Sequence, residues 1–66
     1  MIDTDLHHFA KSLQRRWPNL PAGAKPIASN IIEQVKNLAG HPSPAILLRF
    51  IERQMTMFRE RMQEAQ

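Results

Sequence analysis

The residues of this sequence that could do chemistry are its three histidines and the carboxylates near two of them. His7 and His8 follow Asp3 and Asp5, and a histidine beside a carboxylate is the usual pair for moving a proton. Neighbouring residues on a helix point to different sides, however, so His7 and His8 cannot face the same metal ion or substrate. His41 lies far from both along the chain. We therefore predict neither a metal site nor an acid–base pair from these residues.

The residue types give no support to covalent catalysis either. The sequence has no cysteine and no tyrosine, and its two glycines form no phosphate-binding loop. Ser12, Ser29 and Ser43 occupy positions typical of a surface, a helix and a helix cap. A chain of 66 residues also seldom forms the dry, concave site that general acid–base catalysis needs. The sequence predicts a protein that is not an enzyme and that uses no cofactor.

The charge of the chain is moderately positive. Nine Lys and Arg against six Asp and Glu give a net charge of +3, which favours acidic surfaces but does not identify a nucleic-acid-binding protein. No stretch reaches the roughly 18 apolar residues of a membrane span, and the opening MIDTDLHHFAK is polar where a secretory signal would be basic and then apolar. With cysteine absent as well, we expect a cytoplasmic protein without a membrane segment.

The elements that must position any functional surface are three helices. The five prolines and two glycines fall in the clusters WPNLPAGAKP and GHPSP, and no segment between them alternates apolar and polar residues as a strand would. We predict one all-α domain, residues 1–66, folded as a three-helix bundle with a long C-terminal helix. The predicted helices cover about residues 3–16, 26–39 and 43–64.

The first two helices each have an apolar face and recognisable ends. Asp3 or Thr4 can cap the first helix, which Pro18 ends, while Pro26 suits the first turn of the second and Gly40 its left-handed stop. The first helix carries a narrow stripe made of Ile2, Leu6, Phe9, Leu13 and Trp17. The second carries a wider set made of Ile27, Ala28, Ile31, Ile32, Val35, Leu38 and Ala39.

The third helix is predicted to be the scaffold onto which the other two fold. Ser43 suits its N-cap and Pro44 its first turn. An apolar seam with alternating spacings of three and four faces the core, and it consists of Leu48, Ile51, Met55, Phe58 and Met62.

This helix carries more apolar surface than one small core requires. Ile46, Phe50 and Met57 form a second row beside the seam, with Leu47 between the two, and widen the apolar arc to about 200°, against the roughly 100° that a core-facing helix needs. A 66-residue chain is also marginally stable without a disulfide, a metal or a partner. We therefore predict an interface with another polypeptide, formed by Ile46, Leu47, Phe50, Arg53, Met57 and Arg61.

A helix-turn-helix is the main alternative interpretation. The stretch EQVKNLAGHPSPAILLRFIER has a helix, a break and a second helix, with apolar residues near the positions that such a motif buries. The second helix would present Ser43, Ile46, Leu47 and Arg49 near its start. Base reading calls instead for Arg, Asn, Gln or Lys at such positions, so DNA binding is less favoured than protein binding.

A collinear set of short motifs resembles the theta subunit of bacterial DNA polymerase III. The motifs are Asp5-Leu6, the RRWPNLP corner, KPIA at the start of the second helix, and RFIER in the third. The sequence departs from that family at the loop AGAK and between Pro26 and Pro42, where insertions are needed, and in both tails. The resemblance implies a three-helix accessory subunit of a replication complex that has no activity of its own. It assigns no binding residue.

Together these features predict a non-catalytic helical protein that binds a protein partner, modulates the partner's activity or assembly, and forms a homodimer. The alternatives are a helix-turn-helix regulator and an accessory subunit of a DNA replication complex.

Overall fold

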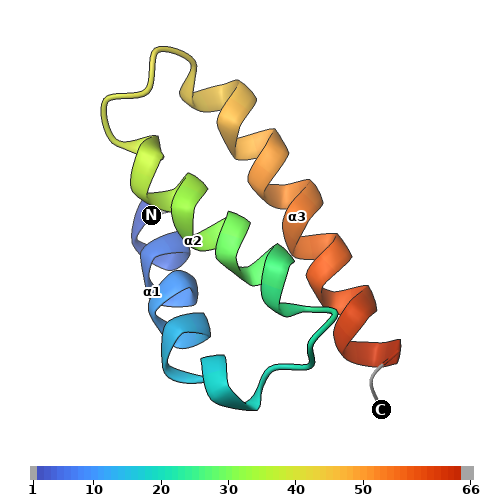
Figure 1. Cartoon of the computed structure of the whole chain (residues 1–66). Helices are drawn as coiled ribbons and strands as arrows, with labels where there is room; N and C mark the ends of the chain where they lie inside the picture. Colours follow the sequence, from blue (N-terminus) through green and yellow to red (C-terminus); the bar gives the residue numbers. More distant parts are fainter. Residues whose placement is uncertain (1, 65–66) are drawn as a thin grey trace.

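The computed structural model describes the backbone of residues 2–64 and the side chains of residues 5–64. Over residues 2–64 the chain forms three α-helices, one 3-10 turn and no strand, which confirms the predicted all-α three-helix bundle (Figure 1). The elements in chain order are α1 (Ile2–Arg15), η1 (Trp17–Asn19), α2 (Lys25–Leu38) and α3 (Pro44–Glu64). The predicted C-terminal end of the third helix coincides with the observed one. Every other predicted helix boundary lies one residue from the observed boundary.

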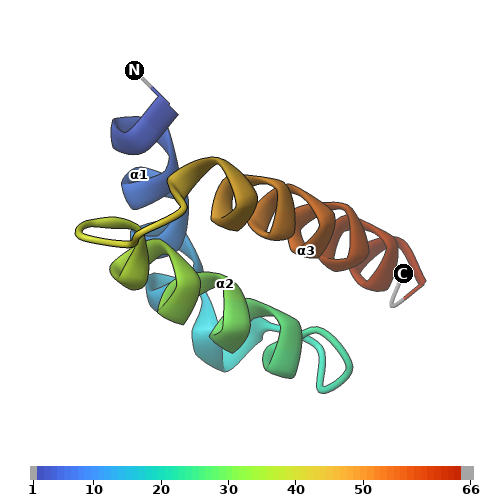
Figure 2. The same ribbon diagram turned by 90° about the horizontal axis from the view of Figure 1, so that it is seen from above.

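The middle helix, α2, joins the bundle together. The most extensive packing is between α2 and α3 and between α1 and α2. Figures 1 and 2 show α2 lying alongside both of the other helices, while α3 runs the length of the molecule. We predicted that the first two helices fold onto the third. This is wrong for α1, because α1 packs more extensively against α2 than against α3.

The core draws on every helix and on the corner between α1 and α2. Ala10, Ala24 and Ala28 are buried alongside the larger side chains, and such small residues let neighbouring backbones approach closely. Leu13, Ile31 and Ile51 are fully enclosed. Phe9, Trp17, Ile32, Leu48, Met55 and Met62 are partly buried against this cluster. Trp17, in the corner that follows α1, therefore covers part of the core.

The face that α3 turns to the core is rotated from the predicted seam. Its buried residues are Leu47, Ile51 and Phe58, whereas Leu48, the predicted start of the seam, is only partly buried. Leu47 was predicted as an interface residue, but it is 6% exposed and belongs to the core. The rotation is possible because Leu47 and Leu48 are both apolar, and packing against α2 and α1 selects between them.

The corner between α1 and α2 is a compact proline-containing turn. Pro18 lies in η1, and the backbone N–H of Leu20 donates to the carbonyl of Trp17 at 3.2 Å. Leu20 and Ala24 are buried, which holds this corner against the helices. The N–H of Lys25 donates to the Pro21 carbonyl at 3.1 Å, so the chain enters α2 through a hydrogen-bonded turn.

The connection between α2 and α3 has the predicted left-handed glycine. Gly40 has a φ of +79°, and the N–H of His41 donates to the Leu38 carbonyl at 3.3 Å across the turn. The N–H of Ser43 then donates to Nδ1 of His41 at 3.0 Å, and the Ser43 carbonyl accepts the N–H of Leu47 at 3.1 Å. Ser43 is therefore at the N-cap position, as predicted, and His41 assists the start of α3.

Some of the sequence predictions fall on residues near the N-terminus. The predicted caps Asp3 and Thr4, and the predicted stripe residue Ile2, have side chains outside the part that the structure describes.

Among the described residues, none of the helices has the length and apolar character needed to cross a bilayer.

Candidate protein-binding face of α3

Three large apolar side chains of α3 point away from the core. Ile46 is 68% exposed, Phe50 45% and Met57 37%. At about 100° per residue these positions fall within an arc of about 40° on the helix, so they form one row along its length. No other large apolar side chain in residues 5–64 is exposed to this degree. We call the surface formed by Ile46, Phe50 and Met57, together with Arg49 and Arg53 beside them, the α3 face.

The α3 face is exposed because no other element within residues 2–64 packs over it. The buried side of α3, marked by Leu47, Ile51 and Phe58, lies roughly 100° around the helix from the row of exposed residues. Both α1 and α2 pack on that buried side, through contacts such as the one between Phe9 and Phe58. The excess apolar arc predicted from the sequence thus leaves apolar area on the surface.

Part of the α3 face is hollowed. Ile46, Arg49, Phe50 and Arg53, all from α3, line a shallow depression of about 210 Å³. The two apolar side chains can bury an apolar side chain of a partner, while the two guanidinium groups can donate several hydrogen bonds to carboxylates beside it. The depression therefore suits an acidic and apolar segment of polypeptide.

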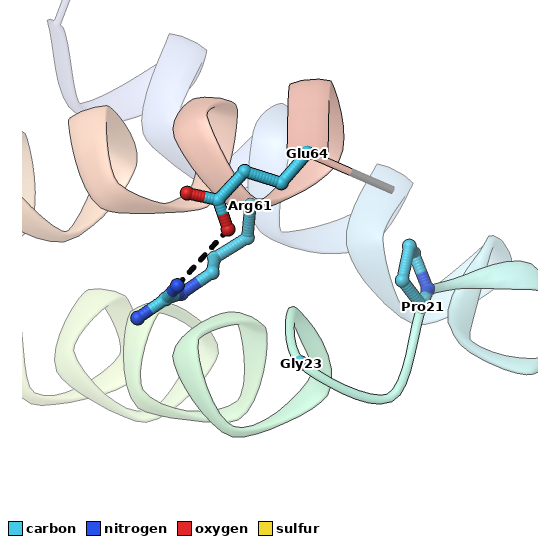
Figure 3. Close-up of a pocket in the computed structure, with 4 residues that line it drawn as sticks. All are labelled: Pro21, Gly23, Arg61 and Glu64. Atoms are coloured by element: carbon cyan, nitrogen blue, oxygen red, sulfur yellow. Dashed lines mark hydrogen bonds and ion pairs between the residues drawn. The ribbon is translucent and has the colours of Figure 1, made fainter. Parts of the chain in front are cut away.

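Arg61 lies at another place on α3. Its Nη1 donates to Oε2 of Glu64 at 3.0 Å, and the two side chains are 50% and 63% exposed. Together with Pro21 and Gly23 they line an open hollow of about 370 Å³ beside the loop that precedes α2 (Figure 3). A surface ion pair of this kind contributes little to stability and can exchange partners.

A third depression lies between α1 and α2, away from the α3 face. It measures about 140 Å³ and is lined by His7, Ala10, Lys11, Gln14, Ile32, Val35 and Lys36. Its polar residues are cationic or neutral, so the histidine has no carboxylate in the lining with which to form an acid–base pair. Within the described residues no three His, Cys, Asp or Glu side chains are grouped so as to hold a metal ion.

The structure places the six predicted interface residues in three environments. Ile46, Phe50 and Arg53 come together in the 210 Å³ depression, and Met57 continues the same row. Arg61 pairs with Glu64 nearer the α2 loop, and Leu47 is in the core. Sequence reasoning left Arg49 out of the predicted interface. Its position one helical turn before Arg53 and next to Phe50 is the signal that could have included it.

Comparison with known proteins gives no match: no family model, no curated protein and no solved structure aligns with this chain. The resemblance to the theta subunit stays a prediction.

Proposed function

We propose that this chain is a non-catalytic helical protein whose α3 face binds another polypeptide and so changes that polypeptide's activity or assembly. The bound polypeptide buries the row formed by Ile46, Phe50 and Met57, and the arginines beside the row set its orientation. We propose a cytoplasmic location for this role, and an accessory subunit of a DNA replication complex is an alternative to it.

One observation carries the proposal. In a chain of 66 residues the three most exposed large apolar side chains of the described part lie in one row, with exposed fractions of 68%, 45% and 37%. Single exposed apolar residues are common on protein surfaces, but a row of them rimmed by charges is typical of an interaction site. Aromatic residues and arginine are also enriched at the centre of protein interfaces, and Phe50 lies beside two arginines here.

The small size of the protein supports the same proposal. A domain this short buries only about 60% of its unfolded surface, so its own core contributes little surplus stability. Covering about 400 Å² of apolar surface at about 25 cal/mol/Å² contributes on the order of 10 kcal/mol before the costs of association are subtracted. A partner bound to the α3 face would therefore stabilise the fold of this chain, while the chain changes the partner's activity or assembly.

The test is site-specific photo-crosslinking in cells that carry the gene. A photoreactive amino acid at position 50 or 57 reports any polypeptide lying on the α3 face, including a second copy of the chain. The same amino acid at position 52 is the matched control, because Glu52 is exposed on the opposite side of α3. We expect crosslinked products at positions 50 and 57 and none at 52. The absence of any product at positions 50 and 57 would overturn the proposal.

Duplex binding distinguishes the helix-turn-helix alternative. A DNA-binding regulator would bind duplex DNA at low salt, with an affinity that falls steeply as salt is added. We expect no such binding at low salt. Sequence-dependent binding would instead assign α3 to a DNA groove.

A further inference from the structure

We infer that the α3 face pairs with the same face of a second copy of this chain, with the two α3 helices antiparallel. This inference rests on the proposed function, because it names the polypeptide that occupies that face. The antiparallel pairing is supported by the order of charges along one flank of α3.

One flank of the α3 face is positive in its first half and negative in its second. Arg49 and Arg53 are exposed in the N-terminal half, and Glu60 and Glu64 are exposed in the C-terminal half. At about 100° per residue the four positions fall within an arc of about 60°, directly beside the apolar row. A helix with this order of charges is complementary to a second copy running in the opposite direction.

The spacing of these charges fits one symmetry axis. The pairs Arg49 with Glu64, and Arg53 with Glu60, share a midpoint between Thr56 and Met57. A two-fold axis at that midpoint places each arginine opposite a glutamate of the second copy, and symmetry forms each pair twice. Parallel two-fold pairing would instead turn this flank toward the opposite flank of the second copy, so these arginines and glutamates would not meet.

The apolar groups are compatible with the same arrangement. Met57 lies beside the axis and therefore packs against Met57 of the second copy, where unbranched thioether side chains adapt readily to one another. The depression lined by Ile46, Arg49, Phe50 and Arg53 receives the C-terminal half of the second α3, which brings glutamates to the two guanidinium groups. The ion pair that Glu64 makes with Arg61 is exposed, so Glu64 can exchange it for Arg49 of the second copy.

The size of this contact sets the expected strength. One face of α3 buries about 400 Å² on each copy, so the total of about 800 Å² is below the roughly 1,200 Å² of stable specific interfaces. The dimer should therefore be weak and dependent on concentration, with a dissociation constant of tens of micromolar or more.

Sedimentation of charge-reversal variants tests the pairing. R49E/R53E makes the flank wholly negative and E60R/E64R makes it wholly positive, and we expect each to weaken dimerisation of the full chain by at least about tenfold. The variant that carries all four changes restores opposite charges across the axis and should recover the wild-type dissociation constant within about threefold. E52R/R59E is the matched control, because Glu52 and Arg59 are exposed on the other side of α3.

Cysteine pairing tests the direction of the helices, because the chain contains no cysteine of its own. In the antiparallel arrangement Met57→Cys lies near its counterpart and should form an interchain disulfide under mild oxidation. Arg49→Cys lies about 22 Å from its counterpart along the axis, beyond the roughly 7 Å that a disulfide spans, and should link only to a chain carrying Glu64→Cys. Linking of Arg49→Cys with itself, without linking to Glu64→Cys, would contradict the antiparallel pairing.

The outcomes separate this inference from the proposed function. A chain that stays monomeric to millimolar concentration, or charge reversals that leave the dimer unchanged, would overturn the antiparallel pairing. Crosslinks from positions 50 and 57 to a different protein, found together with a monomeric chain, would leave the proposed function standing. Crosslinks to the chain itself, with the charge and cysteine results above, would support both.

Discussion

The rings of Phe9 and Phe58 meet edge to face, with centroids 6.1 Å apart and ring planes at 87°. This contact joins α1 to α3, which α2 otherwise holds together by packing against both. Phe58 is 4% exposed, while Phe9 is only partly buried. The pair therefore closes the core on the side where the two outer helices approach each other.

The first prediction concerns the energy of this aromatic pair. An edge-to-face pair contributes about 0.5–1.5 kcal/mol beyond the burial of its area, because the positive edge of one ring meets the negative face of the other. Phe9→Leu keeps an apolar side chain but removes the ring, and should lower the free energy of unfolding by about 1–2 kcal/mol. Urea unfolding followed by circular dichroism measures the change.

A double-mutant cycle isolates the ring–ring term. Phe9→Leu, Phe58→Leu and the double variant should give a coupling of about 0.5–1.5 kcal/mol. Additive losses would mean that the two rings contribute only their buried area.

A second prediction concerns the glycine between α2 and α3. Gly40 has a φ of +79° and a Cβ at this position would meet no atom within 4 Å, so backbone strain alone decides the effect of a side chain. Gly40→Ala should lower the free energy of unfolding by about 1–2 kcal/mol, since L-residues disfavour the left-handed region by that amount.

Gly23 provides the matched control for this measurement. A Cβ there also meets no atom within 4 Å, but Gly23 has no positive φ. Gly23→Ala should therefore leave stability unchanged, or raise it by up to about 1 kcal/mol by restricting the unfolded chain. Equal losses from the two variants would contradict the assignment of strain to Gly40.

A third prediction concerns His41, which supports the start of α3. Its Nδ1 accepts the N–H of Ser43 at 3.0 Å in a partly buried position. His41→Ala leaves this N–H without its acceptor and should lower the free energy of unfolding by about 0.5–1.5 kcal/mol. His8→Ala removes an exposed histidine of α1 and should have little effect. Thermal unfolding of the two variants side by side measures the difference.

The helices and their ends could be predicted from the sequence because their signals are local. Pro18, Gly40 and Ser43 act through the backbone of their own neighbours, so a reader of the sequence sees the cause directly. Leu20 and Ala24 could not be predicted as core residues, since a loop has no periodicity and their burial depends on how the corner folds back on the helices. The bond from Ser43 to His41 depends in the same way on the shape of the turn.

Only part of the candidate site could be predicted from the sequence, because the exposed side of α3 depends on how the other helices pack. An apolar arc of about 200° predicts that some of α3 is exposed, and Ile46, Phe50 and Met57 are. So wide an arc has no unique centre, however, and only the packing of α1 and α2 determines that Leu47 is inside while its neighbour Ile46 is outside.

The last prediction uses these two neighbours. Leu47 is 6% exposed and Ile46 is 68% exposed, although both are branched aliphatic residues in the first turn of α3. Leu47→Ala should lower the free energy of unfolding by about 2–4 kcal/mol, because it removes buried methyl groups and leaves a cavity. Ile46→Ala should change stability by less than about 0.5 kcal/mol at low protein concentration, where the α3 face is free. The same Ile46→Ala variant should weaken dimerisation measured by sedimentation, whereas a large loss of folding stability from Ile46→Ala would place that side chain in the core and contradict the orientation of α3.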